Sequence, residues 1–221
     1  MKEKNTLLPS EQINEDAQLN KVREVYNGES RFYDITRKLV LKHRKQSIDK
    51  LSIKPHQIIL DGGCGTGQNF PYIYQLLKGS GKIIGVDCSR KMLGIAKKMI
   101  AKNNYQNIEL YEADAINFVP SPMIDAAIFS DVLFLIPNFK RALENVVYKL
   151  KVGGKVCILD FKVSDNSFLK PLNRPWRKWS NFYGGDFGRK PWKILEQLLG
   201  NVQFEEHFFG FRYIASATKR S

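Results

Sequence analysis

Short apolar runs alternate with stretches of helical periodicity through the middle of the chain. The runs predict five strands, at residues 57–61, 82–87, 108–112, 126–130 and 155–161. Between them, apolar residues that recur every three or four positions predict helices at residues 69–77, 92–102 and 139–150. Neighbouring parallel strands need crossover connections that cover the sheet. The alternation therefore predicts an α/β fold with a parallel sheet and helices on both faces.

The segment before the first strand has two parts. Residues 1–20 are polar and mixed in charge, which predicts a flexible N-terminal arm. In residues 21–52 the apolar positions recur at spacings near three and four, with a break at Asn27-Gly28. This pattern predicts two amphipathic helices that form an N-terminal helical cap.

The pattern changes again after the fifth strand. Residues 162–193 combine prolines, a Gly-Gly pair and several aromatic rings with eight Lys or Arg, and we interpret them as an aromatic and basic insertion. Residues 192–199 then predict a helix, and 202–209 and 211–217 predict an antiparallel pair that closes the sheet. Residues 21–221 are therefore expected to form a single domain whose seven-stranded sheet is mostly parallel, with an antiparallel C-terminal strand.

Composition adds limits to this picture. The chain of 221 residues is 43% hydrophobic and has no apolar run of the roughly 20 residues that span a bilayer, so we expect a cytoplasmic protein. Its formal charge of +13 favours phosphate-bearing partners, such as nucleic acid or anionic lipid, or simply reflects a lysine-rich surface. Cys64, Cys88 and Cys157 are far apart in the sequence, and we expect neither a disulfide nor a metal site.

A glycine-rich segment follows the first predicted strand. It has the form Asp61-x-Gly63-x-Gly65-x-Gly67. Glycines between a buried strand and a helix let the backbone approach a ligand closely, as in nucleotide-binding turns. The spacing differs from that of dinucleotide enzymes, and the acid before the glycines would repel a phosphate but suits a ligand with an ammonium group.

The segment Leu60-Asp-Gly-Gly-Cys-Gly-Thr-Gly67 resembles the first motif of the class I S-adenosylmethionine-dependent methyltransferases, a family with a Rossmann-like fold. Later positions fit the same family. Asp87 ends the second strand, Asp114 follows the third, and Asp131 follows the fourth. The segment Lys151-Val-Gly-Gly154 matches the family's turn before the fifth strand, except that Val152 stands where the family usually has proline.

The resemblance implies S-adenosylmethionine as the cofactor. The glycine loop would lie against its methionine part with help from Asp61, Asp87 would accept both ribose hydroxyls, and Asp114 would read the adenine amino group. The cofactor-binding residues implied in this way are Asp61, Gly63, Cys64, Gly65, Gly67, Asp87, Asp114, Ala115, Ser130, Tyr33 and Arg37.

Two regions give evidence about the acceptor: the helices before the glycine loop, and the insertion. The Tyr33-Asp34-x-Thr36-Arg37 segment is similar to quinone-biosynthesis methyltransferases and, in detail, to phospholipid and betaine-lipid headgroup N-methyltransferases. This likeness implies that Tyr33 and Arg37 close the pocket. Alternatively, Tyr33 is an aromatic residue of the core and Arg37 is a cation on the surface. The tryptophans and cations of the insertion suit peripheral contact with a membrane, stacking on unpaired bases, or an ordinary lid.

The expected function is methyl transfer to a small-molecule acceptor, an amine of a lipid headgroup, at the inner membrane face. Alternatives are methylation of RNA or of a quinone precursor, transfer of the aminocarboxypropyl arm to a lipid, and a non-catalytic cofactor-binding module. The methyl carbon is already activated, so alignment matters most. Candidate catalytic residues are Asp131, Tyr33 and His207, with His43 as a further base; Asp131 equally fits a helix cap, and His207 a strand histidine. Acceptor atom, number of methyl groups and oligomeric state stay open.

Overall fold

The structure is a computed structural model that describes residues 37–220, with side chains from Leu41 onward. The predicted N-terminal arm, the first helix of the predicted cap and Tyr33 lie outside these residues. The side chain of Arg37 lies outside them as well, although its backbone begins the first described helix.

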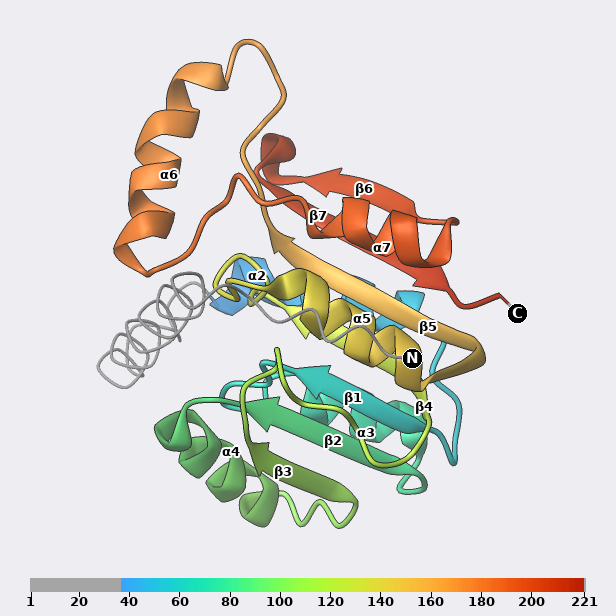
Figure 1. The fold of residues 1–221 in the computed structure, drawn as a ribbon. Coiled ribbons are helices and arrows are strands. Elements are labelled where there is room, and N and C mark those ends of the chain that lie inside the picture. The colour runs from blue at the N-terminus through green and yellow to red at the C-terminus, as the bar shows by residue number, and fades with distance from the viewer. Residues whose placement is uncertain (1–36, 221) are drawn as a thin grey trace.

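Seven strands form one sheet in the order β3-β2-β1-β4-β5-β7-β6 (Figure 1). Their bounds are Ile58–Gly62 (β1), Lys82–Asp87 (β2), Ile108–Glu112 (β3), Ile124–Ser130 (β4), Leu150–Phe161 (β5), Gln203–His207 (β6) and Arg212–Thr218 (β7). The first five strands are mutually parallel, and β7 runs antiparallel to both β5 and β6. The predicted Rossmann-like α/β fold, with its mostly parallel sheet and antiparallel C-terminal strand, is confirmed.

Helices cover both faces of the sheet. The helices are α2 (Arg37–Lys50), α3 (Phe70–Leu77), α4 (Arg90–Lys102), α5 (Phe139–Lys149), α6 (Asn173–Phe182) and α7 (Pro191–Leu199). On one face α2, α3 and α4 pack on the sheet through residues such as Ile48, Phe70 and Leu93. On the other face α5 and α7 pack through residues such as Leu143 and Leu195. Successive residues of a strand point to opposite faces of the sheet, so each apolar run contributes side chains to the core on both faces.

The glycine pair before the fifth strand differs from its prediction. We expected a turn at residues 151–154, but β5 begins at Leu150 and runs through them. Leu150 pairs with Ile124 and Lys155 with Ala126, so the four residues between bulge away from β4. The N–H of Gly153, at φ 80°, instead donates to the carbonyl of Lys219 at 2.8 Å. The glycines therefore form a bulge inside a long strand.

The predicted insertion contains the short turn η2 (Lys170–Leu172) and helix α6. Figure 1 shows α6 standing apart from the helices that cover the sheet, beyond the carboxyl end of β5. None of the helices within residues 37–220 has the length and apolar character needed to cross a membrane. The insertion is thus a projection from the edge of the sheet at which the parallel strands end.

Candidate cofactor site

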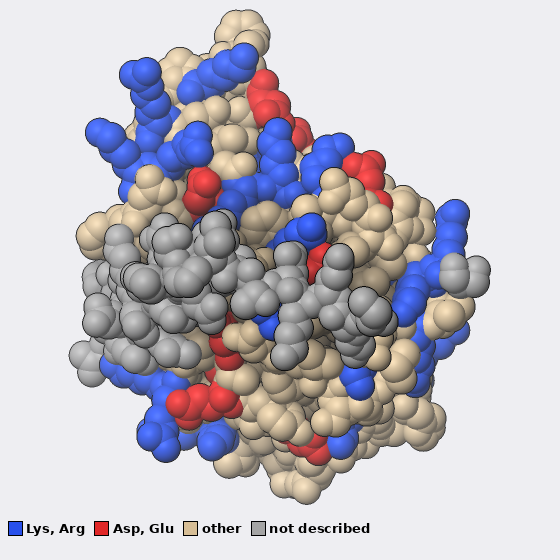
Figure 2. Space-filling view, in the orientation of Figure 1, with Lys and Arg blue, Asp and Glu red and all other residues tan. Residues whose placement is uncertain are grey.

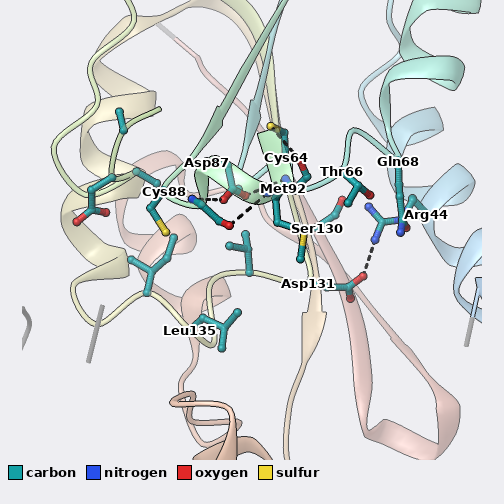
Figure 3. A pocket seen from close by; sticks show the side chains of 18 residues that line it. Arg44, Cys64, Thr66, Gln68, Asp87, Cys88, Met92, Ser130, Asp131 and Leu135 are labelled. Carbon is teal, nitrogen blue, oxygen red and sulfur yellow. Dashed lines mark hydrogen bonds and ion pairs between the residues drawn. The ribbon is translucent and has the colours of Figure 1, made fainter. Parts of the chain in front are cut away.

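A cavity opens at the carboxyl ends of β1, β2 and β4 (Figure 3). Chain segments far apart in the sequence meet there because the carboxyl ends of parallel strands lie at the same edge of the sheet. The lining residues are Arg44, Gly63, Cys64, Gly65, Thr66, Gln68, Asp87, Cys88, Ser89, Met92, Ala113, Asp114, Ala115, Ser130, Asp131, Val132, Leu135 and Ile136.

The glycine loop is pinned to the neighbouring strand by its backbone. The N–H groups of Gly63 and Cys64 both donate to the carbonyl of Val86, at 2.8 and 2.9 Å. Gly63 has φ 69°, and a Cβ there would lie 2.3 Å from Cγ2 of Val132. Gly65 has φ 56°, and a Cβ there would have no other atom within 4 Å, because the cavity lies in front of it. The loop therefore presents backbone to the cavity.

Asp87 ends β2 beside this loop. One carboxylate oxygen accepts the N–H of Gly65 and the other accepts the N–H of Ser89, each at 2.8 Å. Burial raises the pKa of this carboxyl, and the two backbone donors act in the opposite direction. The carboxylate thus holds the turn of the loop in place while lining the cavity.

Asp61 lies beneath the loop and outside the cavity wall. The side chain is fully buried, and Oδ1 accepts the amide N–H of Asn69 at 2.9 Å. Burial raises the pKa of Asp61 to about 7. Oδ2 makes no hydrogen bond with the residues that the structure describes. A buried oxygen of this kind is a strong acceptor for a donor that enters the site.

Asp114, Ala115 and Ser130 all line the cavity as the sequence predicts. A carboxylate oxygen of Asp114 also accepts the N–H of Ile116 at 2.9 Å, which stabilises the turn after β3. The hydroxyl of Ser130 accepts the amide N–H of Asn69 at 3.2 Å. Gly67 is absent from the lining; a Cβ on it would strike Phe70 and Met99, so its place is in the packing of α3 against α4.

Asp131 lines the cavity, but both its oxygens are engaged. Oδ2 accepts from Arg44 on α2 at 2.8 Å, and Oδ1 accepts from Arg212 on β7. All three side chains are about 5% exposed. Asp131 also has φ 57°, and its N–H donates to the carbonyl of Leu159 at 2.7 Å. The carboxylate is the centre of a buried ion-pair cluster, and the role of Asp131 as a base stays a prediction.

Comparison with known proteins gives this arrangement a family. Residues 53–205, more than half of the chain, match the methyltransferase-domain family. The chain belongs to that family. The predicted class I family and its cofactor, S-adenosylmethionine, are confirmed.

Two curated relatives of this methyltransferase act in quinone biosynthesis. The chain is 32% identical to a demethylmenaquinone methyltransferase of Lactobacillus johnsonii, over 58% of this chain and 53% of that protein. It is 26% identical to a ubiquinone/menaquinone biosynthesis C-methyltransferase of Vibrio campbellii, over 76% of this chain and 66% of that protein. The chain thus spans between half and two thirds of the length of these relatives.

A solved structure shows the same fold. A phosphoethanolamine N-methyltransferase of Haemonchus contortus, in complex with S-adenosyl-L-methionine, superposes with a TM-score of 0.69. The match covers 81% of this chain and 53% of that one, at 15% identity. At this identity the likeness concerns the fold.

His207, a predicted catalytic residue, is absent from the cavity wall. It lies on β6 with its ring 4.5 Å from that of His43 on α2. Burial lowers the pKa of His43, and the neighbouring His207, Arg212 and Lys42 lower it further. His207 thus lies on β6 beside α2 and outside the cavity wall, and its catalytic role stays a prediction.

Several cavity residues were missed from the sequence. Cys88, Ser89 and Met92 follow Asp87 closely, so the end of β2 and the first turn of α4 could have indicated them. Val132, Leu135 and Ile136 follow β4, but their apolar character alone gives no functional signal. Arg44 contacts Asp131, 87 positions away, and its other nitrogen donates to Asn69 at 2.9 Å. No local pattern predicts such a distant pair.

Proposed function

We propose that this chain binds S-adenosylmethionine in the cavity and transfers its methyl group to a small-molecule acceptor. The observation that carries the proposal is the carboxylate of Asp87, fixed by the N–H of Gly65 at the end of β2 and lining the cavity. A carboxylate so placed accepts the two hydroxyls of a ribose. The family match over residues 53–205 supports the same reading.

The described residues fit this cofactor in two further ways. The open space in front of Gly65 accommodates a chain that lies against the backbone. The unpartnered oxygen of buried Asp61 suits the donors of an amino-acid end, directly or through water. When bound, the cofactor supplies a methyl group on a sulfonium, which needs no further activation. The protein's task is then to orient the acceptor and exclude water.

We propose an amine as the acceptor group and a lipid headgroup as its source. Support comes from the apolar side chains of Val132, Leu135 and Ile136 along the cavity, which suit an acceptor with an apolar portion. A neutral amine attacks with its own lone pair. A nitrogen–carbon bond forms as the carbon–sulfur bond breaks, and the product ammonium later releases a proton to solvent. This chemistry agrees with the engagement of both Asp131 oxygens.

A quinone precursor is the second candidate. The relatives from Lactobacillus and Vibrio favour it, since both are named for quinone biosynthesis. Methylation of a ring carbon needs a deprotonated ring hydroxyl, and therefore a proton acceptor. A role for Tyr33 in either reaction stays a prediction.

The test uses S-adenosylmethionine labelled in the methyl group and, separately, in the carboxyl group. Purified protein is incubated with phosphatidylethanolamine vesicles, with vesicles containing a demethylated quinone, and with RNA. The proposal expects methyl label in the aminophospholipid and S-adenosylhomocysteine in equal amount. Label in the quinone would support the second candidate. Carboxyl label in the lipid would instead indicate transfer of the aminocarboxypropyl arm, and cofactor binding without any product would indicate a binding module.

A further inference from the structure

Helix α6 exposes a row of apolar side chains. Leu172, Pro175, Trp179 and Phe182 are spaced three, four and three residues apart, which places them on one face of the helix. All four are exposed, with Phe182 66% and Trp179 45% accessible. Phe168, just before the helix, is 91% exposed. Single exposed apolar residues are ordinary on a protein surface, but a continuous row of them marks a contact surface.

Trp176 of α6 attaches the helix to the domain. The ring of Trp176 packs against Phe161 and Phe187, at centroid distances of 5.8 and 5.1 Å. Its indole N–H donates to the carbonyl of Lys162 at 3.2 Å. Trp179 also belongs to this cluster, since its ring centroid lies 5.3 Å from that of Trp176 and 5.7 Å from that of Phe187, yet 45% of its surface is exposed.

The contacts that attach the segment after α6 to the domain reach the wall of the cavity. Behind the helix, the N–H of Asp186 donates to the carbonyl of Phe134 at 2.8 Å, and Arg189 donates to the same carbonyl at 3.1 Å. Arg189 also donates to the carbonyl of Ile136, which lines the cavity together with Leu135. The exposed row is thus part of a projection whose base is bonded to the cavity wall.

Cations adjoin the apolar row. Arg174 and Lys178 lie one turn apart on the neighbouring face of α6, and Lys170, before the helix in the sequence, and Lys190, just before α7, are exposed as well. Figure 2 shows Lys and Arg side chains gathered over the end of the molecule where α6 projects. The acidic residues of this region, Asp165 and Asp186, are paired with Lys162 and Arg177. The surface is therefore apolar and positively charged at once.

We propose that this surface, Phe168, Leu172, Pro175, Trp179 and Phe182 with Arg174 and Lys178, docks on a bilayer that contains anionic phospholipid. Aromatic rings settle at headgroup depth, and adjacent cations meet the anionic headgroups. The aliphatic side chains of Leu172 and Pro175 within the row favour an apolar interior over unpaired bases, because base stacking uses aromatic rings. Docking would bring the cavity wall at Leu135 and Ile136 towards the membrane. That the protein collects its acceptor from the bilayer in this way rests on the proposed function.

The test measures co-sedimentation of the full chain with vesicles of phosphatidylcholine alone and with about one third phosphatidylglycerol. Two double variants probe the surface, Phe168→Ser/Phe182→Ser and Arg174→Gln/Lys178→Gln. Their matched controls are Tyr148→Ser, 67% exposed on α5, and Lys97→Gln/Lys98→Gln, exposed on α4. Circular dichroism and calorimetric affinity for S-adenosylhomocysteine show that each variant is folded, and neither depends on vesicles.

We expect binding to the anionic vesicles that salt weakens. The serine variant should bind about tenfold more weakly, because two rings no longer enter the interface. The glutamine variant should lose about 30-fold, from two cations near an anionic surface. Both controls should bind as the natural chain does. Absence of vesicle binding, or equal losses in the controls, would overturn the proposal. So would binding to RNA, without vesicle binding, that Arg174→Gln/Lys178→Gln removes. Failure of methyl transfer with intact vesicle binding would count against the proposed function alone.

Discussion

Asp87 and Asp131 are two carboxylates in the wall of one cavity, held in opposite ways. Asp87 takes its hydrogen bonds from backbone N–H groups of the loop beside it and of Ser89, two residues on. Asp131 takes its bonds from Arg44 and Arg212, which are 87 and 81 positions away. Each carboxylate accepts one donor on each oxygen, but the donors of Asp131 are positively charged guanidinium groups, which make it the centre of an ion-pair cluster. From this difference we propose that Asp87 binds the ligand and that Asp131 supports the cavity wall.

Of the four substitutions that test this comparison, the replacement of Asp131 should have the largest effect, a loss of stability. Asp131→Ala leaves two buried arginines without their partner, so the free energy of unfolding should fall by about 3–5 kcal/mol. Urea denaturation measures the change. The control is Glu205→Ala, which removes an exposed partner of Lys50 and should cost less than about 1 kcal/mol. If Asp131→Ala is stable but has lost turnover, the result would indicate that Asp131 acts as a catalytic base.

The buried acid Asp61 should make stability depend on pH. Its pKa is about 7 in the folded chain and 3.8 when exposed, so the protonated form favours folding. Its stabilising contribution is complete below about pH 4 and is lost as the pH rises towards 7, by up to about 4 kcal/mol. Asp61→Asn should remove this loss, and Asp49→Asn, at an exposed position, should not. Urea denaturation at acidic and at mildly alkaline pH compares the three proteins; parallel pH profiles would contradict the assignment.

Replacing Asp87 should weaken cofactor binding without a comparable loss of stability. Asp87→Ala removes an acceptor for the ribose and frees the N–H of Gly65, so affinity for S-adenosylhomocysteine should fall about 100-fold. Isothermal titration calorimetry measures it. Glu112→Ala, at the end of the adjacent strand β3 and outside the cavity wall, is the control and should bind normally. Unchanged affinity in Asp87→Ala would show that the ribose does not bind at Asp87.

The smallest effect is expected at Gly65. Gly65→Ala places a methyl group in the cavity and strains a residue at φ 56°, so cofactor affinity should fall about tenfold. Gly79→Ala is matched for strain, at φ 73° with no atom within 4 Å, but lies outside the cavity. Calorimetry and urea denaturation should show similar stability for both and weak binding for Gly65→Ala alone. Equal binding would mean that the cofactor does not approach this loop.

The difference between local and distant partners also explains which features could be predicted from the sequence alone. The strands, their order of appearance and the loop at Gly63 to Gly67 were predictable because short apolar runs and glycine spacing are local patterns. Asp87 and Asp114 were predictable because each follows a strand. The contacts of Asp131 and His207 were not predictable, since they involve side chains from α2 and β7 that meet only in the folded sheet. The bulge at Gly153 likewise depends on pairing with Lys219.

The position of β7 has a consequence for folding during synthesis. β6 is made before β7, yet it joins the sheet through β7. While residues 162–211 leave the ribosome, the edge of β5 that pairs with β7 has no partner, and β6 has no strand to join. Arg212, the first residue of β7, is also the residue that completes the cluster around Asp131. A nascent chain is therefore expected to assemble the glycine loop and Asp87 early, and to finish the other wall of the cavity when β7 is inserted.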